Sequence, residues 1–202
     1  MNRFEYRCFD RHLGHLDQRL RQLAGSPDIR ESREVYLLAA GRLDQNLKIR
    51  GGQLDLKTRV QTRDGFEQWA PAGKWRFPLA STALKTLKDA LGLERNITES
   101  EAMTPEALVD ALTQTKQTVL AIDLFKRRFG YRLEQAGAEV SAEWAEVEIN
   151  GAGIQTVCVE STDLEAATEL AETIGLLAHP NCNYLQALAR VTGLEQRAQN
   201  PS

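Results

Sequence analysis

The chain has 202 residues, of which 42% are hydrophobic and 26% charged. This is ordinary globular composition, and the length suits one domain with its own core. The formal net charge of −3 argues against a surface that binds nucleic acid as a whole, although one basic cleft stays compatible with it. The first residues are charged, and no stretch approaches the roughly 20 apolar residues of a spanning helix. We therefore expect no membrane association.

Three scattered cysteines bear on the cellular compartment. They are too few for a disulfide framework, and no CxxC pair indicates zinc. This usage predicts reduced thiols and a cytoplasmic protein, with the cysteines at Cys8, Cys158 and Cys182.

The first part of the chain predicts a run of antiparallel strands with one helix. Apolar and polar residues alternate in five segments, namely 4–9, 35–39, 47–50, 54–61 and 66–69. Between the first two segments, leucines at helical spacing predict a helix that ends at Gly25. Tight turns at Gly51-Gly52 and at 63–65 separate the last three strands. The order is that of a meander, not of a βαβ unit.

The middle of the chain predicts two helices. Ser81 is expected to cap the first, which carries leucines at helical spacing and ends at Gly92. Thr104 followed by Pro105 is an N-cap with a first-turn proline, and it predicts the start of the second.

The last part returns to strands and then closes with helices. Strands are expected over 119–131, 145–149 and 155–161, with the facing of residues 126–128 left open. Thr162 and Glu165 form a capping-box pattern before a further helix.

A short helix is expected from Asn183, and the residues after 195 are polar. We expect a single domain over residues 1–195 and a flexible tail over 196–202.

Each expected strand has one apolar and one charged face. Within 54–61, apolar Leu54, Leu56 and Val60 alternate with polar Asp55, Lys57, Arg59 and Gln61. Helices on the apolar face leave the charged face either in water or curled around a polar cavity. Alternation alone fits both an open α+β sandwich and a closed barrel.

The order of these segments resembles the CYTH superfamily, also called triphosphate tunnel metalloenzymes. Known members include bacterial adenylyl cyclases, thiamine triphosphatases and inorganic triphosphatases. The likeness covers nearly the whole chain and rests on a charged first strand, a basic strand, a lysine strand, an arginine strand, an acidic last strand and a closing Asn-Tyr-Leu segment. These stand at residues 4–7, 46–50, 54–59, 125–131, 157–163 and 183–185.

The resemblance implies an α+β fold: a mainly antiparallel, eight-stranded β tunnel or barrel with helices packed outside and charged faces turned inward. It implies phosphate-binding side chains at Arg7, Lys48, Arg50, Lys57, Arg59, Arg127 and Arg128, with Lys126 as an alternative in the arginine strand. Converging ammonium and guanidinium groups suit the charge of a triphosphate.

The resemblance also implies a metal site and a catalytic role for carboxylates. Glu5, Glu148 and Glu160 are the expected ligands of Mg²⁺ or Mn²⁺, and Glu5 and Glu160 the expected catalytic residues. In this hypothesis a metal-bound water attacks the terminal phosphorus.

Two strands depart from the family pattern. The first usually reads Glu-x-Glu-x-Lys, whereas this chain has Glu5, Arg7 and Phe9 at those positions. The last usually offers Glu-x-Glu, whereas this chain offers Cys158 and Glu160. Fewer oxygen ligands and an added cation both weaken divalent-metal binding.

Two functions follow as hypotheses. One is a metal-dependent triphosphatase, a phosphoric anhydride hydrolase, that acts on triphosphate, polyphosphate or a nucleotide polyphosphate. The other is a catalytically inactive module that binds a phosphate-rich ligand or a protein partner. Family members often form homodimers, but no residue pattern in this chain sets the oligomeric state.

Overall fold

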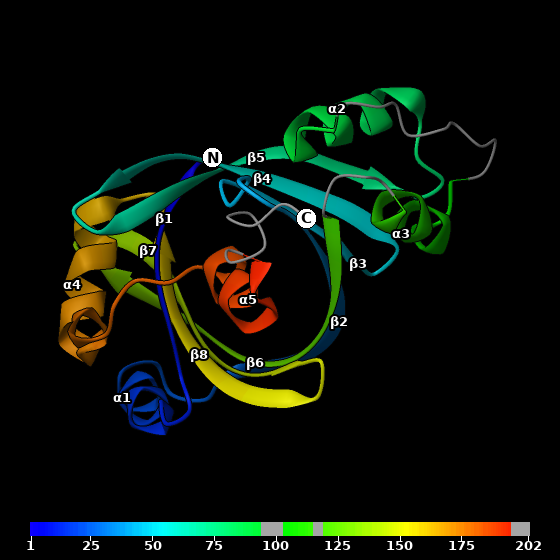
Figure 1. Cartoon of the computed structure of the whole chain (residues 1–202). Helices are drawn as coiled ribbons and strands as arrows, with labels where there is room; N and C mark the ends of the chain where they lie inside the picture. Colours follow the sequence, from blue (N-terminus) through cyan, green and yellow to red (C-terminus); the bar gives the residue numbers. More distant parts are fainter. Residues whose placement is uncertain (94–102, 115–118, 195–202) are drawn as a thin grey trace.

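The computed structural model describes residues 1–93, 103–114 and 119–194. Eight antiparallel strands form a closed barrel in the order β1-β5-β4-β3-β2-β6-β7-β8 (Figure 1). This confirms the expected α+β tunnel and rules out the open sandwich. The strands are β1 (Arg3–Asp10), β2 (Asp28–Ala39), β3 (Gln45–Arg50), β4 (Gln53–Arg63), β5 (Phe66–Arg76), β6 (Val119–Gln135), β7 (Ala138–Ile149) and β8 (Ala152–Ser161).

Five α-helices and a short 3₁₀ turn are described, at α1 (Gly14–Ala24), α2 (Ser81–Leu91), α3 (Pro105–Thr113), α4 (Leu164–Ile174), η1 (Leu176–Ala178) and α5 (Tyr184–Thr192). Among the described helices, none is long and apolar enough to cross a membrane. The expected tail at 196–202 lies outside the described residues.

The helix caps agree with the sequence at two positions and differ at two. Thr104 accepts a hydrogen bond from the Ala107 backbone N–H, and Asn183 makes a full capping box. Ser81 is instead the first residue of α2, which has no side-chain cap. The prediction of Thr162 as a cap was also wrong, because the next residue, Asp163, accepts from Ala166 N–H. A carboxylate is the stronger charge partner for a helix N-terminus.

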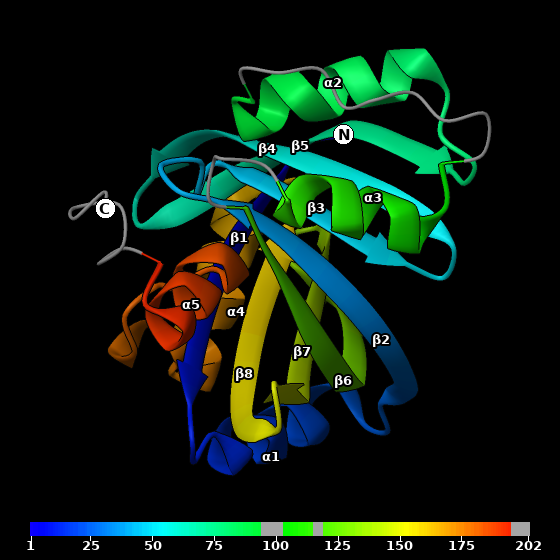
Figure 2. The ribbon, with the colours of Figure 1, turned by 45° about the vertical axis from the view of Figure 1, so that its right-hand side comes forward.

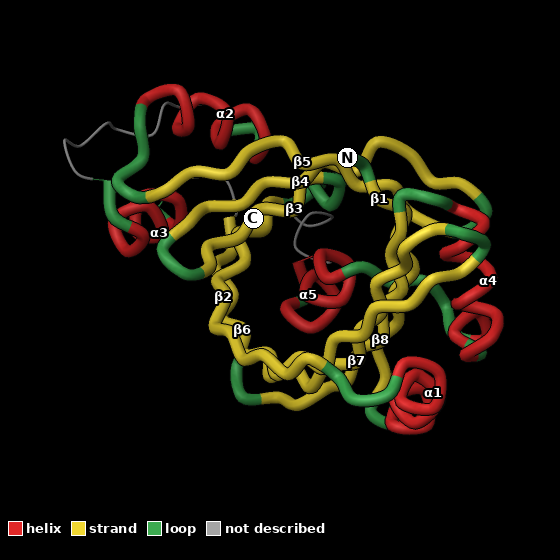
Figure 3. Tube along the Cα trace, turned by 180° about the vertical axis from the view of Figure 1, so that it is seen from behind, coloured by secondary structure: helices red, strands yellow, loops and turns green. Residues whose placement is uncertain are grey.

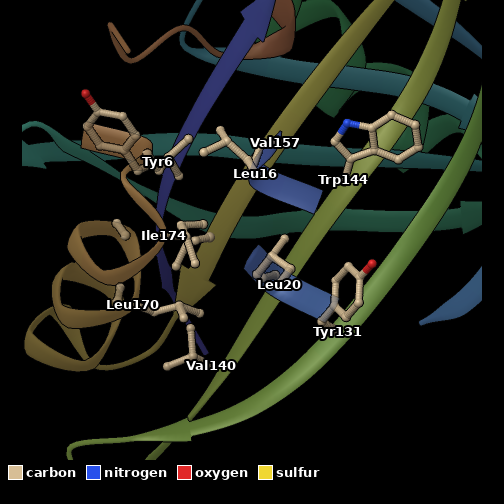
Figure 4. Close-up of a cluster of buried hydrophobic side chains, with 14 of the residues drawn as sticks. Tyr6, Leu16, Leu20, Tyr131, Val140, Trp144, Val157, Leu170 and Ile174 are labelled. Carbon is tan, nitrogen blue, oxygen red and sulfur yellow. The ribbon is translucent and has the colours of Figure 1, made fainter. Parts of the chain in front are cut away.

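Helices cover the apolar outer faces of the barrel on two sides (Figure 2). Helices α1 and α4 pack against β1, β6, β7 and β8, where Leu20, Leu170 and Val157 are fully buried (Figure 4). Helices α2 and α3 pack against β2, β3 and β4, with Leu54 and Leu87 fully buried. Two separate outer cores thus hold the barrel wall from outside.

Helix α5 fills one end of the barrel interior. It lies within the ring of strands when the barrel is viewed along its opening (Figure 3). Its Leu185 and Leu188 pack against apolar side chains that point inward from β2, β6 and β7, among them Leu38, Ile122 and Val147. This third core closes one end of the tunnel and leaves the rest of the interior to polar residues.

Residues 181–182, just before α5, close a gap in the barrel wall between β1 and β5. Strand β1 pairs with β5 over residues 3–5, whereas it pairs with β8 over residues 4–10. Where β5 diverges, Arg7 N–H donates to Asn181 Oδ1 at 3.0 Å and Arg7 C=O accepts from Cys182 N–H at 2.7 Å. Residues 181–182 therefore hold both the N–H and the C=O of Arg7.

Candidate anion-binding cavity

The polar part of the interior forms a cavity of about 610 Å³. Side chains from every strand line it, together with Asn183 and Tyr184 at the start of α5. Its cationic lining residues are Arg7, Arg30, Lys48, Arg50, Lys57, Lys74, Lys126 and Arg128, and its anionic ones are Glu5, Glu31, Glu34, Asp55, Glu143 and Glu160. The inward-facing charges of the strands thus converge, as the resemblance implied.

Glu143 on β7 is the centre of one charge cluster. Its carboxylate accepts from Arg7 Nη1 at 2.8 Å and Lys126 Nζ at 2.7 Å, and Arg128 Nε lies 3.0 Å away. Gly130, which faces Glu143 across the strand pair, leaves room for this approach, since a Cβ there would lie 3.2 Å from Arg128 Nη2. Burial alone would raise the pKa of Glu143, but the surrounding cations outweigh it and hold the pKa well below its usual range.

Glu34 on β2 is the centre of a second cluster. It is 2% exposed and accepts from Lys48 Nζ at 2.8 Å and Arg50 Nη1 at 3.3 Å. Burial opposes its ionisation, yet Lys48, Lys126 and Arg50 lower its pKa to about 2. Burial also disfavours the charged ammonium and, despite the attraction of Glu34, lowers the pKa of Lys48 to about 8.

Arg7 bridges the two carboxylates on its side of the cavity. Its Nε donates to Glu5 Oε1 at 2.9 Å, while Nη1 donates to Glu143 and to Thr156 Oγ1. Its guanidinium carbon lies 4.7 Å from the centre of the Tyr184 ring. Burial would lower the pKa of Arg7, but the neighbouring anionic groups raise it above its usual value. The residue is a permanent buried cation.

The cations nearer solvent are less constrained. Arg50 and Lys74 share Asp55 at 3.5 and 3.6 Å, with side chains 45% and 59% exposed. Lys57 is exposed and makes no ion pair within 4 Å to any described carboxylate. Such side chains exchange partners at little cost, because exposed pairs contribute little to stability.

Besides Nε of Arg128, which lies 3.0 Å from Glu143, two buried polar atoms at the cavity have no hydrogen-bond partner among the described residues. These are the hydroxyl of Tyr184 and Oδ1 of Asn46. Buried polar groups in folded proteins are normally satisfied by protein, water or ligand. Both atoms are thus available to a molecule inside the cavity.

Five of the predicted phosphate-binding residues line the cavity, namely Arg7, Lys48, Arg50, Lys57 and Arg128. The other two do not. Arg59 is held by Glu67, which also accepts from Asn183 at the start of α5. Arg127 lies on the outer face, 3.6 Å from Glu31 and 3.8 Å from Glu146.

Glu34 and Glu143 were not predicted from the sequence, because the alternation predicted a second strand from residue 35 and a seventh from residue 145. The structure begins β2 at Asp28 and β7 at Ala138. Apolar Val140, Ala142 and Trp144 alternate with polar Ser141 and Glu143, and this alternation was the available signal.

Two of the three predicted metal ligands, Glu5 and Glu160, face each other across the β1–β8 strand pair and line the cavity. Glu5 is paired with Arg7, and Glu160 is paired with Arg3 at 3.0 Å. Glu148 is exposed and does not line the cavity. Over residues 1–93, 103–114 and 119–194, no group of three or more His, Cys, Asp or Glu could hold a metal ion. The carboxylates present therefore do not fit a divalent-metal site.

Comparison with known proteins supports the fold. The chain matches no protein-family model and no curated protein sequence. Among solved structures, it is similar to HpAC1 from Hippeastrum, an adenylyl cyclase candidate with a dominant triphosphatase activity, at 15% identity and a TM-score of 0.52, covering 95% of this chain and 96% of that one. A conserved hypothetical protein from Pyrococcus furiosus matches at 16% identity and a TM-score of 0.51, covering 91% and 98%. At 15–16% identity these likenesses show that the chain shares its fold with these solved structures.

Proposed function

We propose that the barrel cavity binds a triphosphate or short polyphosphate anion, either free or as part of a nucleotide. The observation that carries this proposal is the convergence of eight Lys and Arg side chains, against six carboxylates, on one cavity that opens to solvent. A volume of about 610 Å³ also falls within the range of small-molecule sites, about 300–1,000 Å³.

The charge arrangement separates fixed from adjustable cations. Arg7, Lys126 and Lys48 are held by buried Glu143 and Glu34. Lys57, nearer the opening, makes no ion pair with a described carboxylate and can turn toward an anion, and Arg50, which is 45% exposed, can exchange its contacts with Glu34 and Asp55 for an anion. Charge-assisted hydrogen bonds from such groups both strengthen the binding of an anion and fix its orientation.

We favour binding over metal-dependent hydrolysis. The carboxylates expected to hold Mg²⁺ or Mn²⁺, Glu5 and Glu160, are each paired with an arginine. Hydrolysis stays a prediction, for which phosphate release from tripolyphosphate, ATP or thiamine triphosphate is the direct assay. Release that depends on metal and is lost in Glu160→Gln would favour the enzyme.

Calorimetry with tripolyphosphate at low ionic strength tests the binding proposal, because screening is weakest there. Lys57→Ala and Arg50→Ala should each raise Kd by about tenfold or more, the loss expected for one charge-assisted hydrogen bond.

Adjacent positions on β6 supply a matched pair. Arg128→Ala removes a cavity cation and should weaken binding, whereas Arg127→Ala removes an outer-face cation and should leave Kd within about twofold. Equal effects of the two substitutions, or no binding at millimolar tripolyphosphate, would contradict the proposal. Indifference to phosphate would instead favour a protein-interaction module.

A further inference from the structure

The position of Arg7 suggests more than a phosphate contact. Its side chain points from β1 into the cavity and ends between Glu5 and Glu143, two carboxylates from different strands. Arg7 is 6% and Glu143 8% exposed, so the pairing takes place almost out of contact with solvent. Residues 181–182 hold the backbone of Arg7, and the two carboxylates hold its guanidinium.

The same carboxylates are the oxygen ligands that a divalent cation would need. Glu143 already accepts from Arg7 and Lys126, and Arg128 lies 3.0 Å from it. A divalent cation entering here would compete with the existing partners for these oxygens. It would also be repelled by the positive charges of Arg7, Lys126 and Arg128. At such separations in a buried site, like charges repel strongly.

Arg7 still has a free edge for a ligand. Its hydrogen bonds use Nε and Nη1, and Nη2 makes none with any of the described residues. The guanidinium lines the cavity over the ring of Tyr184, whose hydroxyl has no hydrogen-bond partner among the described residues.

We propose that the Arg7 guanidinium is a built-in cation that replaces a divalent metal, so that this cavity binds its polyphosphate anion directly and without metal. Arg7 pairs with both Glu5 and Glu143, and it offers Nη2 to a phosphate oxygen. The inference rests on the proposed function for the identity of the anion, but not for the absence of a metal requirement.

The first experiment uses the free protein and Mn²⁺ alone. Titration followed by electron paramagnetic resonance of free Mn²⁺ should show no specific binding to the wild-type protein at sub-millimolar metal. Arg7→Glu, which exchanges the cation for a third carboxylate beside Glu5 and Glu143, should gain a Mn²⁺ site. Tight Mn²⁺ binding by the wild-type protein that is lost in Glu5→Gln would overturn the inference.

The second experiment measures tripolyphosphate binding in EDTA and in Mg²⁺, with the free anion corrected for Mg²⁺ complexes. Wild-type Kd should differ by less than about threefold between the two conditions, and Arg7→Gln should raise Kd by about tenfold in EDTA. Binding that requires Mg²⁺ overturns the inference but leaves the proposed function standing. Absence of binding in both conditions overturns the proposed function, and the Mn²⁺ titration then decides on Arg7 by itself.

Arg7 variants remove a buried charge, so folding must be checked. The double variant Glu5→Gln with Arg7→Gln removes one carboxylate together with the guanidinium and lessens the charge imbalance. If it folds by circular dichroism yet binds tripolyphosphate in EDTA as tightly as the wild type, Arg7 does not serve as the proposed cation.

Discussion

The two ends of the barrel interior are built from the same strands but carry opposite chemistry. On β2, inward-facing Ser32 and Glu34 give way to Tyr36 and Leu38. On β6, the inward Arg128 and Lys126 give way to Leu124 and Ile122. One end is a cavity of paired charges, and the other is an apolar core filled by α5.

We expect the apolar end to contribute mainly to the stability of the fold and the charged end mainly to ligand binding. The α5 end buries apolar area and stabilises the fold in proportion to that area. The charged end buries ions whose desolvation offsets much of their attraction, so it is weak evidence for stability. Substitutions at the two ends should therefore change different measured quantities.

The largest expected effect comes from Glu143→Gln at the charged end. This variant keeps the side-chain shape but leaves Arg7, Lys126 and Arg128 without their shared anion. Breaking a buried pair in this way costs about 4 kcal/mol, read as the free energy of unfolding in urea. Tripolyphosphate should nevertheless bind more tightly, because the cavity becomes more positive.

Glu146→Gln is the control, since Glu146 lies on the same strand but on the outer face, exposed and 3.8 Å from Arg127. Its effect on unfolding should stay below about 0.5 kcal/mol. A stable Glu143→Gln with unchanged Kd would show that the cluster matters to neither property.

The next effect is expected at the apolar end. Leu188 on α5 is fully buried among inward-facing side chains. Leu188→Ala should lower the free energy of unfolding by about 3 kcal/mol, while Kd for tripolyphosphate below the unfolding temperature stays unchanged. Val191→Ala on the same helix, at 55% exposed, should change neither. A large rise in Kd for Leu188→Ala would mean that the two ends are coupled.

The sequence predicted the strands because alternation is a local property, but it could not say what covers each face. On β7, apolar Val140 and Trp144 face outward against the α1 and α4 side, whereas Val147 and Ile149 face inward against α5. The apolar face thus changes sides within one strand, at Ala145. A single alternation rule therefore found residues 145–149 and lost the half that carries Glu143.

Only part of the site was predicted, again because the apolar face changes sides within some strands. Lys48, Arg50 and Lys57 follow regular alternation on β3 and β4 and were placed correctly in the cavity. Arg127 and Glu148 fall on the strands where the apolar face changes sides, and both point outward. Which carboxylate pairs with which cation depends on contacts between strands far apart in sequence, such as Arg7 with Glu143, and no local pattern carries that information.

The smallest expected effect concerns pH and separates Lys48 from its neighbours. Burial lowers the pKa of Lys48 to about 8, so its charge is present below that pH and lost above it. An anion binds the charged form, so tripolyphosphate affinity should fall as pH rises from 7 to 9, by up to about tenfold. Calorimetry across this range measures the change.

Tripolyphosphate itself loses protons there, so the comparison is made against Lys48→Arg, whose guanidinium stays charged. The ratio of the two Kd values cancels the ionisation of the ligand. A ratio that grows with pH places Lys48 at the anion, whereas parallel curves would exclude its charge from binding and leave Arg50 and Lys57 as the adjustable cations of the charged end.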